Sequence, residues 1–284
     1  MAFDLIVRGG TIVDGSGLPG FEGDIGITDG MITEIGDLSG QTADEAIDAS
    51  GHVVSPGFID GHAHYDAQIF WDDIGSNICW HGVTTAIMGN CGFTLAPCAE
   101  QNKRLVFSNL EMAEEISPEA MEAGIDWSWE TFPEFMDHVD SIPKGINYAT
   151  YVGHSAIRTY VMGERAYKDV ANADDLAAME DQVETAMRAG AVGFSTGLNY
   201  PPAAAAPTEE IVGIAKALTD YGALYCTHMR DEGEHVMAAL DESFLIGRET
   251  GAPVVISHHK VHGIKNFGRS PETLRHIDSA ARRQ

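Results

Sequence analysis

The sequence predicts an α/β protein: a parallel (β/α)8 barrel preceded by a small β-domain. Glycine turns separate short strand-like runs in the first 54 residues, and strand-like and helix-like runs alternate from residue 55 onward. Repeated strand–helix units form a parallel sheet. Side chains that bind metals also follow several of the later strands, and the carboxyl ends of the strands are where such a barrel places its site.

The first 54 residues are expected to form the small β-domain. Turn signals occur at Gly9-Gly10, Asp14-Gly15, Asp29-Gly30 and Ser50-Gly51. The predicted strands between them cover residues 5–8, 11–13, 24–27, 31–35 and 46–48. We therefore predict one domain at residues 1–54 and a second at 55–284.

Strands and helices are expected to alternate in the second domain. Its predicted strands are residues 57–64, 83–89, 147–153, 191–196, 223–228 and 253–258. Its predicted helices cover residues 174–189, 208–221, 234–249 and a last one that begins near Ser270. In the first of these helices Met179 and Val183 lie on one apolar face, and Asp174 is the expected N-cap.

Residues 92–145 are too many for a simple connection between two elements. The segment contains Trp127, Trp129 and Phe132, so it has enough apolar surface to pack. An insertion at this face of a barrel often becomes a lid or a wall of the substrate pocket. An extra packed pair of helices is the alternative, and the sequence leaves both open.

The number of units falls short of a closed barrel. Six strand–helix units fit into 284 residues, whereas the barrel has eight. The first and sixth strands would then be open edges of a parallel sheet that is normally buried. We therefore expect a barrel truncated after about six units, in a chain that is a fragment or a truncated gene product.

Composition limits the classes of function. The formal net charge of −26 repels phosphate backbones, so no nucleic-acid partner is expected; the acidity fits a well-solvated surface or, alternatively, a salty habitat. No apolar run approaches the ~20 residues of a membrane span, and the N-terminus does not resemble a signal peptide. Four irregularly spaced cysteines do not form a disulfide scaffold. We expect a cytoplasmic protein without a membrane partner; its oligomeric state stays open.

Zinc-binding side chains lie at the ends of four predicted strands. His62 and His64 are separated by one residue of the first predicted strand, so both side chains face the same side. Cys91 follows the second strand between glycines, and His228 and His258 end the last two strands. Imidazoles and a thiolate gathered at strand ends are typical of a zinc site. The sequence therefore predicts a metal-dependent hydrolase.

Three residues near these positions receive other predictions. His259 has the opposite strand parity to His258 and is expected to face the outer helices. Cys226 lies deeper than His228 on the same face and is expected to pack inside the barrel. His154 ends the third strand, where it is either a substrate contact or a hydrogen-bonded structural histidine.

Six short motifs occur together in this sequence. They are Gly57-Phe58-Ile59-Asp60-Gly61-His62-Ala63-His64, Trp80-His81-Gly82-Val83-Thr84-Thr85, Gly89-Asn90-Cys91-Gly92, Gly193-Phe194-Ser195-Thr196-Gly197-Leu198-Asn199-Tyr200-Pro201-Pro202, Thr227-His228-Met229-Arg230 and Ser257-His258-His259-Lys260. With the opening run of residues 8–15, they resemble the N-acyl-D-amino-acid deacylase (D-aminoacylase) family of the amidohydrolase superfamily. The resemblance covers essentially the whole chain and implies an amidohydrolase-type barrel.

The resemblance implies a reaction and a set of metal ligands. The reaction is zinc-dependent hydrolysis of the amide bond of an N-acyl-D-amino acid, which gives a D-amino acid and a carboxylate. By motif, Cys91, His228 and His258 match the ligands of a tightly held zinc. His62 and His64 match those of a second, weaker or sometimes empty position.

The resemblance also implies substrate contacts. Tyr200 and Lys260 match positions that hold the substrate, with Lys260 pairing with its carboxylate. Arg230 shares parity with His228 and is a further candidate, for which a helix-capping salt bridge is the alternative. The general base of the family is an aspartate at the end of the eighth strand. We therefore expect the catalytic base beyond residue 284 and assign no substitute.

Two other functions remain open at this point. One is hydrolysis of a cyclic amide in the manner of hydantoinases or dihydroorotases, against which the cysteine ligand and the absence of a lysine in the fourth strand both count. The other is a catalytically inactive fragment that binds metal.

Overall fold

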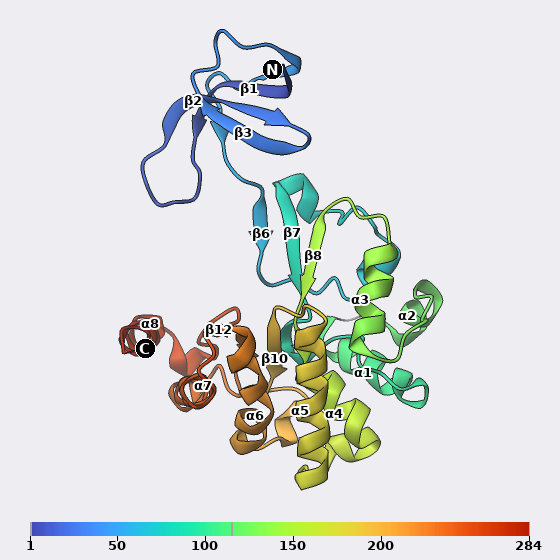
Figure 1. Ribbon diagram of the computed structural model, residues 1–284. Helices are drawn as coiled ribbons and strands as arrows, with labels where there is room; N and C mark the ends of the chain where they lie inside the picture. The colour runs from blue at the N-terminus through green and yellow to red at the C-terminus, as the bar shows by residue number, and fades with distance from the viewer. Residues whose placement is uncertain (1, 115, 284) are drawn as a thin grey trace. The chain divides into compact units, whose positions relative to one another are not determined.

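The computed structural model describes residues 2–114 and 116–283 (Figure 1). The chain divides into two compact units, Met1–Phe58 and Ile59–Gln284. None of the described helices is long and apolar enough to cross a membrane.

The first unit is one sheet with the strand order β3-β2-β1-β4, in which β5 also pairs with β1. Its strands are β1 (Phe3–Ile12), β2 (Phe21–Thr28), β3 (Met31–Gly36), β4 (Ala43–Asp48) and β5 (Val53–Val54). Strand β1 pairs with β2 antiparallel and with β4 and β5 parallel. Phe3, Ile6 and Leu38 form its small apolar core.

The turn predicted at Gly9-Gly10 is wrong, because β1 runs straight through it. The pairing of β1 with β2 shifts register between Val7 and Gly10, and Gly9 has φ +65°. Glycine adopts this left-handed conformation without steric cost, so the chain forms a β-bulge instead of reversing. Asp29-Gly30 does form the predicted turn, between β2 and β3, with both φ angles positive.

The second unit carries strands at all six predicted positions. They are β6 (Phe58–Asp60), β7 (Val83–Met88), β8 (Asn147–Thr150) with β9 (Val152–Gly153), β10 (Gly193–Gly197), β11 (Leu224–His228) and β12 (Val254–Ile256). One sheet has the order β6-β7-β8 and the other β12-β11-β10-β9. Strand β7 pairs with β8 in parallel, and so do all neighbouring strands of the second sheet. Among the described residues these strands form two open sheets and no closed ring; only Tyr151 separates β8 from β9.

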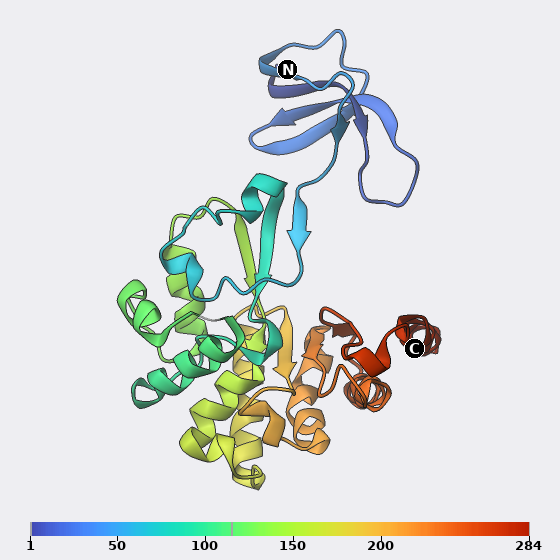
Figure 2. The same cartoon turned by 180° about the vertical axis from the view of Figure 1, so that it is seen from behind.

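Helices lie beside the second sheet, and the last of them packs against the helix before it (Figures 1 and 2). They are α4 (His154–Met162), α5 (Ala173–Arg188), α6 (Thr208–Ala215), α7 (Val236–Thr250) and α8 (Ser270–Ala281). Short 3-10 segments cover Gln68–Phe70, Ile78–His81, Asn90–Gly92, Glu100–Asn102, Gly163–Tyr167, Ala203–Ala205, Lys216–Tyr221 and Ile264–Asn266. Val183 of α5, Ile211 of α6 and Phe194 of β10 are fully buried in the main core.

The N-cap of α5 is Asn172 and not the predicted Asp174. The Asn172 side chain accepts hydrogen bonds from the amides of Asp174 and Asp175, and the Asp175 carboxylate accepts one from the Asn172 amide. Asn172 has an extended backbone, as an N-cap requires, whereas Asp174 already lies in the first helical turn. The helix therefore begins one residue before the predicted range.

The long segment between β7 and β8 forms three helices, α1 (Lys103–Glu114), α2 (Pro118–Gly124) and α3 (Phe132–Ser141). Trp129 is 4% exposed, and its ring stacks on Trp127 with the centroids 4.7 Å apart. Phe135 and Met121 are fully buried in the same core. Of the two alternatives for this segment, the structure matches the packed helices.

Candidate metal centre

Strand ends of the second unit bring five metal-binding side chains together. His62 and His64 follow β6, and Cys91 follows β7. His228 is the last residue of β11, and His258 follows β12. Their donor atoms form two overlapping triads, His62-His64-Cys91 and Cys91-His228-His258, and the donor atoms of each lie within 4.8 Å of one another.

The Cys91 thiol is the shared point of both triads. Its Sγ lies 3.6 Å from His62 Nε2, 3.8 Å from His228 Nδ1 and 3.6 Å from His258 Nε2. With Zn–S near 2.3 Å and Zn–N near 2.0–2.1 Å, tetrahedral geometry separates a sulfur and a nitrogen ligand by about 3.6 Å. The donor set and its spacing therefore fit a zinc ion at the Cys91-His228-His258 triad.

A left-handed turn aims Cys91 into the cluster. Its φ of 54° is unusual for a residue with a side chain, and the flanking Gly89 and Gly92 have φ of 76° and 78°. Ser195 of β10 ties this turn down, because its hydroxyl accepts from the Gly92 amide at 3.0 Å and donates to the Gly89 carbonyl. Such backbone strain, about 1–3 kcal/mol per residue, persists where the surroundings hold it and is common at functional sites.

The side chain of Asn90 and the lack of a side chain at Gly197 also allow the turn to keep its conformation. The Asn90 amide group donates to the carbonyls of Ile87 at 2.8 Å and Ala63 at 3.2 Å. A Cβ on Gly197 would overlap the carbonyl oxygen of Cys91. Glycine at this position of β10 is therefore required for the close approach of the Cys91 turn.

Gly197→Ala is expected to displace the Cys91 turn, because the added methyl group would occupy the space of a backbone carbonyl. We expect zinc affinity to fall about 10- to 100-fold, as when the support around a ligand is lost. Competition with a chromophoric chelator measures this change. Gly213→Ala on α6 is the control, since a Cβ there meets nothing within 4 Å. Equal zinc affinity in both variants would contradict the role given to Gly197.

Three histidines of the cluster, His62, His64 and His228, are uncharged at neutral pH. Burial, aided by the neighbouring histidines, lowers the pKa of each to about 4. Neutral imidazoles each offer a lone pair, which is the form that binds a metal. The cluster is therefore set up to receive a cation and not an anion.

Glu232 also belongs to this cluster, although the sequence reasoning missed it. Its side chain is 4% exposed, and Oε1 lies 3.1 Å from His258 Nδ1. It also forms an ion pair with Lys260. Burial raises the pKa of Glu232, but hydrogen bonds from His258 and Lys260 outweigh it and bring the pKa to about 2. The available signal was a carboxylate four residues after a strand-end histidine.

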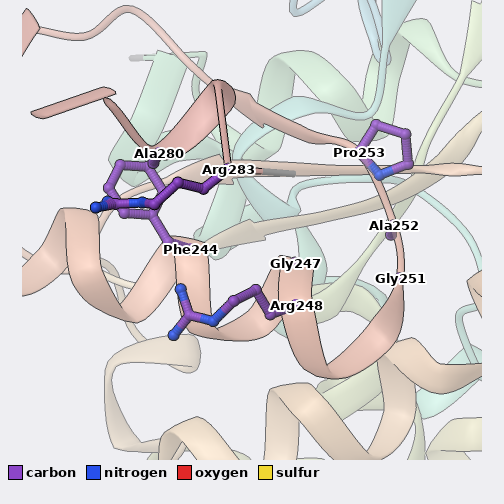
Figure 3. Close-up of a pocket in the computed structure, with 8 residues that line it drawn as sticks. All are labelled: Phe244, Gly247, Arg248, Gly251, Ala252, Pro253, Ala280 and Arg283. Carbon is purple, nitrogen blue, oxygen red and sulfur yellow. The ribbon is translucent and has the colours of Figure 1, made fainter. Parts of the chain in front are cut away.

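Two of the three predicted substrate-binding residues lie at the cluster. Tyr200, Lys260 and Phe93 line a pocket of about 300 Å³ together with the five metal-binding side chains. The ring centroid of Tyr200 lies 4.8 Å from that of His228. A larger cavity, about 850 Å³, lies between α7 and α8, and its lining residues include no histidine, cysteine or carboxylate (Figure 3).

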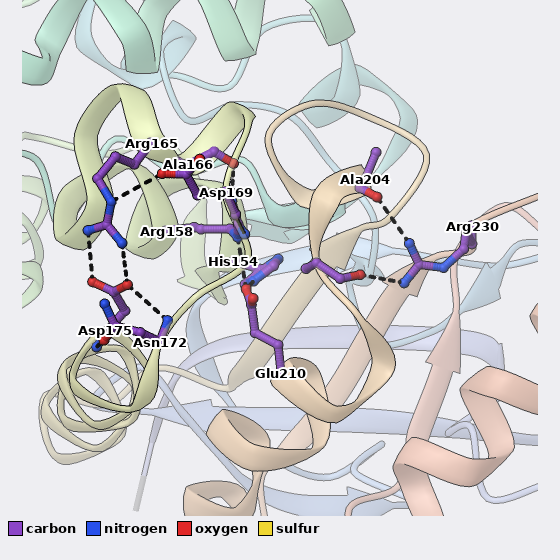
Figure 4. A network of polar contacts seen from close by, with 11 residues as sticks. His154, Arg158, Arg165, Ala166, Asp169, Asn172, Asp175, Ala204, Glu210 and Arg230 are labelled. Carbon is purple, nitrogen blue, oxygen red and sulfur yellow. Dashed lines mark hydrogen bonds and ion pairs between the residues drawn. The ribbon is translucent and has the colours of Figure 1, made fainter.

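Arg230 is not among the residues that line this pocket. Its guanidinium pairs with Glu242 of α7 at 2.8 Å and donates to the Ala206 carbonyl at 3.0 Å. It also donates to the Ala204 carbonyl at 3.4 Å (Figure 4). Strand β11 ends at His228, so the alternation of side chains on which the parity argument depends does not extend to Arg230. The arrangement matches the salt-bridge alternative.

The remaining singled-out residues have structural surroundings. His259 bonds Thr273 of α8 at 2.8 Å, as expected for a side chain that faces the outer helices. Cys226 is fully buried, with its Sγ 3.2 Å from the Ser257 hydroxyl, as expected for a packing residue. His154 is fully buried and bonds Glu210 at 2.9 Å, which matches its structural alternative (Figure 4).

Comparisons with known proteins match this site and fold. The model of the amidohydrolase family matches residues 45–280. The chain is 46% identical over 282 residues to D-aminoacylase of Alcaligenes xylosoxydans xylosoxydans, which covers 99% of this chain and 56% of the relative. The resemblance drawn from the motifs is therefore confirmed, and the chain spans little more than half the length of this relative.

Two solved structures have the same fold. A crystal structure of D-aminoacylase, described as defining a novel subset of amidohydrolases, matches with a TM-score of 0.89 and 43% identity, over 99% of this chain and 57% of that one. N-acyl-D-glutamate deacylase from Bordetella bronchiseptica matches with a TM-score of 0.87 and 36% identity, over 100% of this chain and 57% of that one. The latter was solved with zinc and a phosphonate inhibitor, a mimic of the tetrahedral intermediate.

Proposed function

The chain belongs to the amidohydrolase family, and from this membership we propose that it carries the zinc site of an enzyme that hydrolyses the amide bond of N-acyl-D-amino acids. One observation carries the proposal: a single thiol in a left-handed turn lies 3.6–3.8 Å from three imidazole nitrogens. The similarity to deacylases of N-acyl-D-amino acids supports the substrate class.

Cys91, His228 and His258 would hold one zinc ion tightly. Their spacing matches a tetrahedral site, and Cys91 and His228 are 4% and 5% exposed, whereas His258 lies at the exposed side of the triad. His62 and His64 would supply a second position, because their Nε2 atoms lie 3.2 Å apart and His62 Nε2 lies 3.6 Å from the same thiol; the motif resemblance makes this position the weaker one. When bound, zinc supplies a Lewis acid that polarises the scissile carbonyl and lowers the pKa of a water molecule to about 7.

Lys260 and Tyr200 would orient the substrate at this site. The Lys260 side chain is half-exposed, and its ammonium is the positive charge beside the pocket that suits the carboxylate of an N-acyl amino acid. Tyr200 lies against His228 and presents a hydroxyl donor as well as an apolar ring. Arg230 would contribute indirectly, by holding the chain after β11 through Glu242.

The proposal also assigns the parts of the fold. Residues 1–54 would be the N-terminal part of a small β-domain, and residues 55–284 would be six units of a (β/α)8 barrel. The aspartate that moves the proton would come from a segment equivalent to the part of D-aminoacylase that this chain does not match. The seventh and eighth strands would come from the same segment. A group that donates a proton is required there because the leaving amine must be protonated.

Binding of a transition-state mimic tests the proposal without depending on the proton-moving residue. We expect the 284-residue chain, loaded with zinc, to bind a phosphonate mimic built from an N-acetyl-D-amino acid at least about tenfold more tightly than the mimic of the L enantiomer, a difference of about 1.4 kcal/mol. Isothermal titration measures both affinities, and metal analysis measures zinc per chain. A chain that binds no zinc, or that does not distinguish the enantiomers, would contradict the proposal.

A further inference from the structure

Glu232 spans the two histidines of the proposed tight zinc site from behind. Its Oε1 lies 3.1 Å from His258 Nδ1, and its Oε2 lies 3.5 Å from His228 Nε2. Both nitrogens face away from Cys91, because His258 approaches the thiol with Nε2 and His228 with Nδ1. One buried carboxylate therefore lies within hydrogen-bond distance of the outer nitrogen of His258 and, at the longer distance of an ion pair, opposite the outer nitrogen of His228.

The two histidines need opposite tautomers to bind one ion. His258 must carry its proton on Nδ1 to offer a lone pair from Nε2, whereas His228 must carry it on Nε2 to offer one from Nδ1. An ionised carboxylate accepts hydrogen bonds and does not donate them, so it stabilises a proton on whichever nitrogen faces it. Glu232 faces the outer nitrogen in both cases and so favours both required tautomers.

We propose that Glu232 is a positioning residue that fixes the tautomers and ring orientations of His228 and His258 for zinc. The proposal rests on the proposed function, because it assumes the same metal site. Outer partners of this kind fix the ring orientation of a ligating histidine and raise its basicity. Its position behind the ligands distinguishes Glu232 from the proton-moving carboxylate, which acts on the substrate side.

Lys260 completes the arrangement. Its Nζ lies 3.2 Å from His258 Nδ1 and forms an ion pair with Glu232. A protonated Nδ1 cannot accept from the ammonium, so the carboxylate is the shared acceptor for His258 and Lys260. Glu232 therefore also holds the Lys260 ammonium at the edge of the pocket, where a substrate carboxylate would meet it.

Glu232→Gln tests the inference because an amide replaces one acceptor oxygen with a donor. The amide can accept from one histidine, but its NH₂ group cannot accept from the other. We expect zinc affinity to fall about 10- to 100-fold, measured by competition with a chromophoric chelator. We also expect the thiolate-to-cobalt charge-transfer band of the Co²⁺-loaded chain to shift or weaken, because the ligand geometry changes around Cys91.

Glu234→Gln is the matched control, since it removes the same charge from the same loop at an exposed position. It should bind zinc like the wild type. An unchanged Glu232→Gln, an equal loss in both variants, or a loss that follows a lower Tm of the zinc-free chain would each overturn the positioning role. A wild-type chain without the cobalt band would instead overturn the proposed zinc site itself, so the two failures are distinguishable.

Discussion

Cys91→Ser is expected to reduce zinc affinity by more than about 100-fold, which is the upper end of what the loss of an outer partner costs. The thiol is the common donor of both triads, so no other side chain in either triad replaces it. Serine is nearly the same size, but its hydroxyl is a far weaker zinc ligand than a thiolate. Zinc per chain after dialysis measures the loss.

Thermal unfolding gives an independent measurement of the same change. A ligand that binds only the folded chain, at a free concentration 100 times its Kd, raises the free energy of unfolding by about 2.7 kcal/mol. For a unit of this size that corresponds to a rise in Tm of roughly 5–11 °C. We expect zinc to raise the Tm of the wild type by this amount and that of Cys91→Ser by no more than roughly 1–2 °C, because zinc would then be at or below the Kd of the variant.

Cys98→Ser is the control for this variant. Cys98 is 1% exposed, its thiol contacts the Ala99 carbonyl, and burial raises its pKa to about 12, so it stays a neutral packing residue. Its serine variant should keep both the zinc content and the rise in Tm. Zinc retention by Cys91→Ser would show that the ion binds elsewhere and would remove the basis of the proposed site.

The strands and the convergence of the five candidate metal ligands could be predicted because both depend on short-range patterns. Apolar runs set the six strands, and strand ends that carry His62, Cys91, His228 and His258 converge whenever the strands are parallel. The different directions of His258 and His259 were also predicted, although β12 ends at Ile256 and His258 has a left-handed backbone with φ 35°, so strand alternation itself does not reach these two residues. These inferences needed no knowledge of how distant segments pack.

Predictions were wrong or missing where a backbone angle, or a partner distant in the sequence, determines the local structure. The turn predicted at Gly9 is a β-bulge, because the pairing of β1 with β2 shifts register at this point. The side-chain direction predicted for Arg230 assumed that the strand continues past His228, where β11 ends. The ion-pair partner of Arg230, Glu242, lies on α7. Glu232 was missed because its role exists only after His228 and Lys260 come together.

A buried ion-pair network outside the metal centre is expected to control the stability of the second unit. Glu210 of α6 is 2% exposed, and its Oε1 accepts from His154 Nε2 and Arg158 Nε at 2.9 Å each. Arg158 is fully buried, and its other donors bond the carbonyls of Ala166 and Asp169 (Figure 4). Among these groups Glu210 is the carboxylate that balances the arginine.

Glu210→Ala is expected to lower the free energy of unfolding by about 3–5 kcal/mol, because it leaves the Arg158 charge buried and uncompensated. This corresponds to a fall in Tm of roughly 6–20 °C for a unit of this size. Thermal unfolding in the presence of a chelator measures it without a contribution from metal. Glu209→Ala, in the same first turn of α6 but exposed, should change stability by no more than about 0.5 kcal/mol.

A double variant separates the buried charge from the lost packing. Glu210→Leu with Arg158→Met replaces the ion pair by apolar side chains, a change that is often neutral or stabilising in other proteins. Recovery should be partial here, because His154 Nε2 also loses its acceptor and an unsatisfied buried group costs about 1–3 kcal/mol. A double variant no more stable than Glu210→Ala would show that packing, and not the uncompensated charge of Arg158, carries the effect.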